Sequence, residues 1–470
     1  MVVNSTTDIV NALVAKGVLT EEEGALLNKG REGEAAGQAK ALKKAGKLTV
    51  SDAIDNATIY GDIRLRYEGR DNGAFANGFG STNIGTNAQT AVSHTDLQRS
   101  RYKVTLGVNT KSGDFYSDLA LVMGAKGRSD NANFGVNASN ELDSKNALFL
   151  KRAMVGYKAT DWLTIEAGRI ANPLYTSSMV WDADLNLEGL AEKFTYKIGD
   201  SDLFFTAIQS QYAGVRKLVG IAPGVDSANA TNTVGSSEQF IFQGGVRQLF
   251  NDKLSGKVAA TYTTYSKSPY RSNFGGNFVT ATGSATVNTA NSSGGDLWGV
   301  NDLNVWEIPA EVNYMVADNI GIRAFEHFAW NTSADDRARN STITAAANGS
   351  QSSDDIAWTV GFQVAKAKDL KAFEGNKMAK GDWSAKLWYQ SVGAWSVDAA
   401  AVDSDIFDGR TNMEGVAFKA QYNAQDNVLL NFTAASAKKK NHDLYAFGIG
   451  DIAGDLDKLD LMQFDVTYKF

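Results

Sequence analysis

The chain has 470 residues, a formal net charge of −7, no cysteine, 45 glycines and 4 prolines. The absence of cysteine excludes disulfides, thiolate metal sites and cysteine nucleophiles, and the acidic balance argues against a protein that binds nucleic-acid backbones, which usually carries a basic excess. The sequence contains no run of about 18 apolar residues, the length that a transmembrane helix needs. A transmembrane barrel remains open, because its strands alternate apolar and polar residues.

The first segment of the chain, residues 1–56, has the pattern of short helices. Apolar residues recur at helical spacing between Ile9 and Val14, and Thr20 to Glu23 has the signature of a capping box that opens a second helix. A low-complexity run rich in glycine, alanine and lysine follows. This pattern predicts a helical extension in the periplasm, with a disordered N-terminus and a short coiled coil between protomers as alternative interpretations. No signal peptide is recognisable after Met1, and we expect one to have been removed.

The period of the apolar residues changes to two from residue 57 onward. Apolar side chains share one face between Ile59 and Tyr67, and charged side chains share the other. The same alternation recurs near residues 99–109, 115–123, 147–158, 163–169, 190–198, 203–211, 239–250, 254–265, 304–314, 320–330, 356–364, 383–392, 414–422, 428–435 and 458–470. The pattern predicts about sixteen strands, an even number that leaves both ends of an antiparallel barrel on one side of a membrane.

The connections between these segments alternate in length. Tight turns rich in glycine, aspartate and asparagine alternate with long polar loops, near residues 69–97, 124–146, 170–188, 213–236, 267–302, 331–354, 393–412 and 437–457. The exception is 366–381, which should be a short turn but is long and rich in lysine. Short turns on one rim and long loops on the other are typical of an outer-membrane barrel. We therefore predict an all-β, transmembrane antiparallel barrel over residues 57–470.

The barrel interpretation assigns the two faces of each strand. Apolar residues should contact lipid and polar residues should line a water-filled lumen, which sixteen strands make too wide for side chains to fill. The opposite assignment would bury many unpaired charges, at prohibitive cost. The predicted basic wall of the lumen consists of Arg64, Arg66, Arg99, Arg101, Lys103, Arg152 and Arg169.

The last strand carries a specific local feature. Phe464, Val466, Tyr468 and Phe470 share one face, and the chain ends at Phe470. A terminal strand of this kind looks like the signal that the bacterial barrel-assembly machinery reads. We expect that machinery to be a partner of this chain.

The third long loop carries a family resemblance. Gly168-Arg169 with Asn172-Pro173 is followed by Trp181-Asp182-Ala183-Asp184-Leu185-Asn186-Leu187-Glu188-Gly189. This combination resembles the putative-porin family of bacterial outer-membrane proteins, and the resemblance extends over roughly residues 57–470. It implies a passive channel for ions and small hydrophilic solutes, without cofactor or metal. It further implies a homotrimer in contact with outer-membrane lipid and lipopolysaccharide.

In sixteen-stranded porins the third loop folds into the lumen, so the resemblance implies that the loop near 170–188 narrows the pore. The residues assigned to this constriction are Asn172, Pro173, Trp181, Asp182, Asp184, Asn186 and Glu188. Its three carboxylates would face the basic wall and create a transverse field across the pore. Alternatively, the acids pair with nearby arginines such as Arg169 and fix the loop in place.

Other functions remain open at this point. A substrate-specific channel would need a ladder of lumen residues; the arginine-rich strands would suit anions and the acidic loop would suit cations. A structural or adhesive barrel would contact the cell wall through residues 1–56. An outer-membrane hydrolase would need a triad, and only His94, His327 and His442 are available. Acidic loops such as Asp335-Asp336 could bind calcium, although they lack EF-hand spacing. No nucleic-acid surface is predicted.

Overall fold

The computed structural model describes residues 13–14, 16, 20–23, 54–75, 92–124, 129–135, 146–213, 216–217, 233–234, 237–266, 277–279, 285–287, 302–339, 354–366, 369–370, 373, 379–442, 444, 446, 448, 452 and 455–470. The chain divides into two compact units, residues 1–58 with 110–113 and residues 59–109 with 114–470. No helix among the described residues is long and apolar enough to cross a membrane.

The described part of the first unit contains the predicted capping box. Thr20 Oγ1 accepts a hydrogen bond from the Glu23 backbone N–H at 3.2 Å, and the Glu23 carboxylate accepts one from the Thr20 N–H at 2.9 Å. These reciprocal bonds satisfy two backbone donors at a helix start. The other features predicted between residues 24 and 53 lie outside the described residues.

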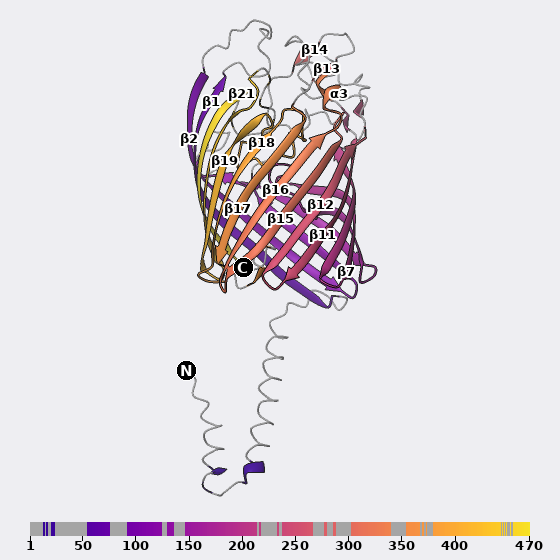
Figure 1. Ribbon diagram of the computed structural model, residues 1–470, viewed down its shortest axis with the longest axis vertical. Helices are drawn as coiled ribbons and strands as arrows, with labels where there is room; N and C mark the ends of the chain where they lie inside the picture. The colour runs from indigo at the N-terminus through magenta and orange to yellow at the C-terminus, as the bar shows by residue number, and fades with distance from the viewer. Residues whose placement is uncertain are drawn as a thin grey trace. The chain divides into compact units, whose positions relative to one another are not determined.

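The second unit is built on a closed antiparallel barrel of sixteen long strands (Figure 1), which confirms the predicted fold class. The strands are β1 (Asn56–Phe75), β2 (Val92–Ser112), β3 (Phe115–Met123), β5 (Leu148–Lys158), β6 (Leu163–Ala171), β7 (Asn186–Ile198), β8 (Ser201–Ala213), β11 (Ser237–Asn251), β12 (Leu254–Tyr265), β15 (Val305–Ala317), β16 (Ile320–Asn331), β17 (Ile356–Lys366), β18 (Trp383–Val392), β19 (Met413–Gln425), β20 (Val428–Lys439) and β21 (Asp455–Lys469).

Several short elements accompany these strands. The two-residue strand β4 (Ala132–Asn133) pairs with β2, β9 (Arg216–Lys217) pairs with β10 (Thr233–Val234), and β13 (Asn277–Val279) pairs with β14 (Ala285–Val287). A single turn of helix, α3 (Ala334–Arg339), follows β16.

The first and last strands close the barrel. β1 pairs with β21 in a register that begins at Asp62 and Lys469. Beyond this pairing, the backbone N–H and C=O of Phe470 both bond to Gly61, at 3.0 and 2.9 Å. The C-terminus lies at the rim that carries the short turns (Figure 1). The seam therefore leaves no open strand edge.

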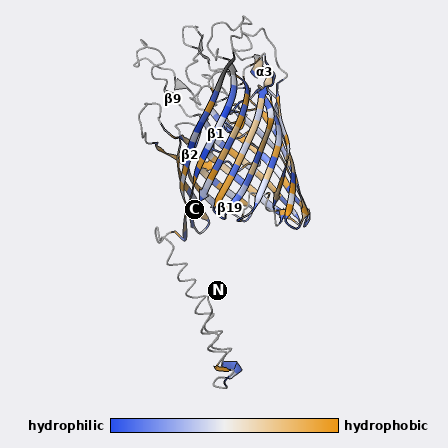
Figure 2. Ribbon diagram, turned by 90° about the vertical axis from the view of Figure 1, so that its left-hand side faces the viewer, coloured by the Kyte–Doolittle hydropathy of each residue, from blue (hydrophilic) through white to orange (hydrophobic). Residues whose placement is uncertain are grey.

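The alternation of side chains sets the two faces of the barrel wall. On β1, Ile59 and Leu65 are about half exposed on the outside, whereas Arg66 and Glu68 are buried on the inside. The hydropathy colours alternate along the strands for the same reason (Figure 2). Water would disfavour this outer face and lipid would favour it, because apolar area stabilises only when it leaves water.

Glycines on the inner face allow aromatic side chains to lie flat against the wall. A Cβ at Gly107 would lie 2.2 Å from Tyr60 Cζ, and a Cβ at Gly156 would lie 2.1 Å from Tyr116 Cζ. The Tyr60 hydroxyl then reaches Asp118 Oδ1 at 2.5 Å. Glycine is required at these positions because any side chain would displace the ring.

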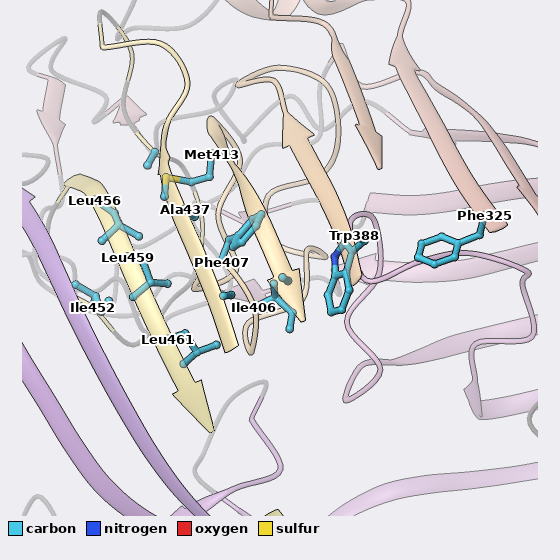
Figure 3. Packing of buried hydrophobic residues seen from close by; sticks show 13 residues of the cluster. Phe325, Trp388, Ile406, Phe407, Met413, Ala437, Ile452, Leu456, Leu459 and Leu461 are labelled. Carbon is cyan, nitrogen blue, oxygen red and sulfur yellow. The ribbon is translucent and has the colours of Figure 1, made fainter. Parts of the chain in front are cut away.

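Two segments differ from the sequence prediction because they fold inward. The segment 393–412 was expected to be a solvated loop, but Trp395 and Phe407 in it are fully buried. Figure 3 shows Phe407 and Ile406 among buried residues of the neighbouring strands. In the lysine-rich turn between β17 and β18, Leu370 and Phe373 are buried as well. The burial of these apolar side chains stabilises the inward position of both segments.

Candidate functional site

The third loop, residues 172–185 between β6 and β7, begins on an apolar patch of the inner wall. Leu174 and Trp181 of the loop pack against this patch, which consists of Ile170, Leu187, Ala191, Ile208 and Ile241. Apolar side chains on the inner face depart from the polar lining expected of a water-filled barrel. They provide the surface that holds the loop inside the barrel.

The loop then crosses to the inner faces of three other strands. The Tyr175 N–H donates to Gln243 Oε1 on β11 at 2.8 Å, and the Tyr175 hydroxyl donates to Glu311 Oε2 on β15 at 2.9 Å. Ser177 Oγ lies 2.7 Å from His327 Nδ1 on β16. These bonds satisfy polar groups of the loop and of the wall at once.

A second inward loop, residues 393–412 between β18 and β19, is joined to the third loop. The Asp182 N–H donates to Ala401 O at 2.7 Å, and Ser404 donates to Asp182 Oδ2 through its N–H at 3.2 Å and its hydroxyl at 3.0 Å. The Asp403 N–H donates to Ser178 O at 3.1 Å. The two loops thus form one hydrogen-bonded body inside the barrel.

The segment 129–135 contributes a further contact. The Asp130 N–H donates to Asp184 Oδ2 at 3.2 Å, and the Asp130 carboxylate pairs with Lys151 and lies 3.8 Å from Lys103 Nζ. Burial and the neighbouring Asp184 raise the pKa of Asp130 to about 6. Asp130 therefore links the third loop to the basic wall.

A charged cavity of about 440 Å³ lies between the loops and the wall. The bases that line it are Arg64, Arg66, Lys103, Lys151, Arg152 and Lys419, and the acids are Asp62, Asp182, Asp184, Asp403, Asp405 and Asp465. Five of the six bases come from strands β1, β2 and β5, and four of the six acids come from the two loops. The cavity therefore has basic residues on one side and loop carboxylates on the other.

Two loop carboxylates in this cavity have opposite protonation. Burial, together with Asp182 and Asp405, raises the pKa of Asp403 to about 8. Burial would also raise the pKa of Asp405, but Arg66 and Arg64 outweigh it and hold that pKa below the usual range. The Arg66 Nη1–Asp405 Oδ1 distance is 2.7 Å. At neutral pH, Asp403 is therefore protonated and Asp405 is charged.

Four of the seven residues of the predicted basic wall line the charged cavity, and of the other three, Arg99 and Arg101 lie elsewhere on the inner wall. Arg99 Nη2 is 2.5 Å from Glu68 Oε1, and Arg101 Nη2 donates to Ser129 Oγ at 3.0 Å. Neither side chain lines the charged cavity. They hold a buried carboxylate and the 129–135 segment in place.

Four residues assigned to the constriction support the loop from within. Asn172 and Trp181 line a small apolar space of about 30 Å³ behind it. Asn172 Oδ1 accepts a hydrogen bond from the Leu174 N–H at 2.9 Å, across the intervening Pro173. Asn186 Nδ2 donates to Asp184 O at 3.2 Å.

Arg169 and Glu188 are placed differently from the prediction, which assigned both to the lumen. They are direct partners in the β6–β7 pairing, and their side chains form an ion pair. Their neighbours Ile170 and Leu187 are buried on the inner face. Because successive residues of a strand alternate in direction, Arg169 and Glu188 lie on the outer face. Because β7 begins at Asn186, before the predicted strand start at residue 190, Glu188 belongs to the wall and not to the loop.

The sequence reasoning missed Asp403, Asp405, Asp130 and Lys151. A usable signal was present in residues 393–412, where aspartates alternate with Trp395, valine, isoleucine and phenylalanine. A solvated loop has little use for so many large apolar residues.

The sequence and the structure were compared with those of known proteins. A family model described as "Putative porin" matches residues 38–295. Similar solved structures include the outer membrane channel DcaP of Acinetobacter baumannii, with 12% identity, coverage of 89% of this chain and 99% of that chain, and a TM-score of 0.41. Salmonella typhi OmpF, in complex with daunomycin, has 11% identity, coverage of 90% and 99%, and a TM-score of 0.42. A mutant of Rh. blastica porin has 10% identity, coverage of 88% and 100%, and a TM-score of 0.38. No curated protein matches the sequence.

Proposed function

Because the chain belongs to the putative-porin family, we propose that it is a passive channel through which ions and small hydrophilic solutes diffuse across the bacterial outer membrane. The family and the closed barrel together point to an outer-membrane channel rather than to an enzyme. The observation that carries the finer proposal is the charged cavity, an open polar space between the inward loops and the basic wall. Solutes would pass it down their own gradient, without cofactor or metal.

Planar-bilayer recording of the purified protein tests this proposal. Stable conductance steps in potassium chloride, together with swelling of liposomes in small sugars, are the expected results. A correctly folded barrel that inserts but gives neither steps nor swelling would overturn it.

Within this proposal, the third loop is the constriction and its acids act on passing ions. Asp184 lines the charged cavity, whereas Glu188 lies on the outer face. Asp184→Asn keeps an acceptor for the Asp130 N–H and removes one charge, so it should lower cation preference in a salt gradient. The matched variant Glu188→Gln removes a carboxylate outside the pore and should leave the reversal potential unchanged. Equal shifts in both variants would contradict this assignment.

The proposal extends to the surroundings of the barrel. The outer face would contact lipid and lipopolysaccharide, Phe464, Val466, Tyr468 and Phe470 would serve as the assembly signal, and the native form would be a homotrimer. The outward exposure of Phe464, Tyr468 and Phe470 supports the assembly role, because an external receptor can reach them. Residues 1–56 would lie in the periplasm and contact the cell wall, which co-sedimentation with peptidoglycan before and after removal of residues 1–56 would test.

A second candidate function, ester hydrolysis, is favoured by one observation. Ser177 Oγ lies 2.7 Å from His327 Nδ1, and His327 Nε2 lies 3.2 Å from Glu307 Oε2. The order of groups is that of a serine–histidine–acid triad. However, His327 Nε2 makes no hydrogen bond among the described residues, so the acid does not orient the imidazole. Release of nitrophenol from nitrophenyl acetate, absent in Ser177→Ala, would establish this activity, and no release from the folded protein would exclude it.

A further inference from the structure

A second cavity, of about 280 Å³, lies between the two inward loops and residues of β15, β16, β18 and β19. We call it the aromatic–basic cavity and define it by Phe325, Trp388, Ile406, Lys386 and Lys419. It shares Asp403, Ile406 and Lys419 with the charged cavity, so the two spaces adjoin on either side of the second loop.

Strand register arranges the wall of this cavity in two parallel rows. One row runs across β16 to β19 and consists of Arg323, Gln363, Lys386 and Lys419; the next consists of Phe325, Gly361, Trp388 and Ala417. Gly361 leaves room for the rings beside it, because a Cβ there would lie 2.6 Å from Phe325 Cζ. Figure 3 shows Ile406 of the loop beside Trp388. The row that contains Phe325 and Trp388 therefore forms an apolar surface directly beside the row that carries the three cations.

Two of these cations form no ion pair within the part of the chain that the structure describes. Lys386 and Lys419 are direct partners across β18 and β19, and like charges in that position destabilise a sheet. Neither forms an ion pair among the described residues, whereas Arg323 pairs with Glu311 at 2.7 Å.

Lys386 Nζ lies 4.5 Å from the Phe325 ring centre and 4.6 Å from that of Trp388. These rings hold the ammonium in place without neutralising it. Asp403 and Glu311 attract this ammonium electrostatically, but neither forms an ion pair with it among the described residues. Asp403 is protonated at neutral pH, as its raised pKa requires. Glu326 alternates with the inward Phe325 and therefore points to the outer face.

We propose that the aromatic–basic cavity is a binding subsite for small aromatic carboxylates in transit through the channel. The carboxylate would lie between Lys386 and Lys419 and relieve their repulsion, and the ring would lie against Trp388 and Ile406. A chloride ion gains only the first interaction and a neutral aromatic alcohol gains only the second, so the subsite favours solutes that carry both groups. This inference rests on the proposed channel function.

Calorimetric titration of the folded, detergent-solubilised protein with benzoate tests the subsite independently of conductance. We expect saturable binding of benzoate. Acetate and benzyl alcohol should each bind at least about tenfold more weakly than benzoate, because each lacks one of the two interactions. This comparison uses the unaltered protein and does not depend on the folding of any variant. Equal heats for benzoate and acetate would overturn the proposal.

Variants then locate the site. Lys386→Gln with Lys419→Gln should weaken benzoate binding roughly tenfold or more, since hydrogen bonds to charged groups are among the stronger ones. The control Lys193→Gln removes a cation that is paired with Glu166 elsewhere on the wall and should leave benzoate binding unchanged. Equal losses in the control and in the lysine pair would overturn the location.

Bilayer recording separates the two levels of the argument. Steps in potassium chloride that benzoate interrupts transiently support both proposals. Conductance steps without benzoate binding support the channel proposal and overturn the subsite proposal. Benzoate binding without steps supports the subsite and overturns the channel.

Discussion

Asp403 gives the pore a charge that depends on pH. Its pKa is raised to about 8 by burial and by Asp182 and Asp405, so the group is neutral at pH 7 and ionises as the pH rises through about 8. The sign follows directly: above pH 8 the charged cavity gains one negative charge, and cation preference should increase. Because the pKa is raised in the folded state, the proton also stabilises the packing of the two loops. That contribution is complete below the ordinary carboxyl value of 3.8 and is lost as the pH approaches 8.

The magnitude follows from the size of the cavity. A sphere of about 440 Å³ has a radius of about 5 Å, so an ion at its centre lies about 7 Å from a lining carboxylate, and Coulomb's law in water gives about 0.6 kcal/mol. Screening at 0.1 M salt reduces this to about 0.3 kcal/mol. The charge favours cations and disfavours anions by this amount, so the permeability ratio should change about threefold, or about 20 mV in a tenfold salt gradient.

The assay is the reversal potential at pH 7 and pH 9, for the unaltered channel and for Asp403→Asn. The unaltered channel should shift toward cation preference, and the asparagine variant should lack that part of the shift. The variant separates Asp403 from every other group that titrates in this range. An equal shift in both proteins would refute the reasoning, as would an unaltered channel whose reversal potential does not move.

Three further changes test the wall and its closure. Gly107→Ala should lower the free energy of unfolding of the barrel by roughly 1–3 kcal/mol, because the added Cβ displaces Tyr60. Gly69→Ala is the control: no atom lies within 4 Å of its added Cβ, so the free energy of unfolding should change by less than about 0.5 kcal/mol. Both are measured by urea unfolding of the barrel in lipid vesicles. Arg66→Gln leaves buried carboxylates unpaired and should cost about 3–5 kcal/mol in the same measurement, which a shift below about 1 kcal/mol would contradict. Phe470→Ala should reduce the amount of assembled barrel in cells but not the conductance of protein refolded in detergent. Normal assembly of this variant in cells would show that Phe470 is not part of the assembly signal.

The wall of the barrel could be predicted because its physics is local. Ile59 and Arg66 point to opposite sides for the same reason that any two strand positions of opposite parity do. Alternating loop lengths then gave strand number and closure, since each hairpin adds two strands. The sixteen strands and the closed barrel follow from this pattern, whereas the pairing of Phe470 with Gly61 is seen only in the structure.

The faces of individual strand ends could not be assigned in the same way. Arg169 was predicted to line the lumen from the end of a strand, and Glu188 was predicted to lie in the third loop, because the alternation fades at Gly168 and Gly189. Their true direction depends on Ile170 and Leu187, apolar residues that point inward to receive the third loop. A lumen that contains an apolar patch breaks the rule by which the faces were assigned, and only the packed loop explains the exception.

The second inward loop was missed for a related reason, and its presence changes what the constriction is. A single loop in a water-filled lumen would order its residues against a large entropic cost. Here Trp181 packs on the wall, Trp395 and Phe407 are buried, and Asp182 and Ser404 join the two loops. Apolar burial thus offsets the cost of order and holds the carboxylates at defined distances from the basic wall. A transverse field requires fixed charges, because mobile ones would follow the passing ion and screen it. In the proposed channel, the apolar residues of the two loops would therefore contribute to ion preference without contacting an ion.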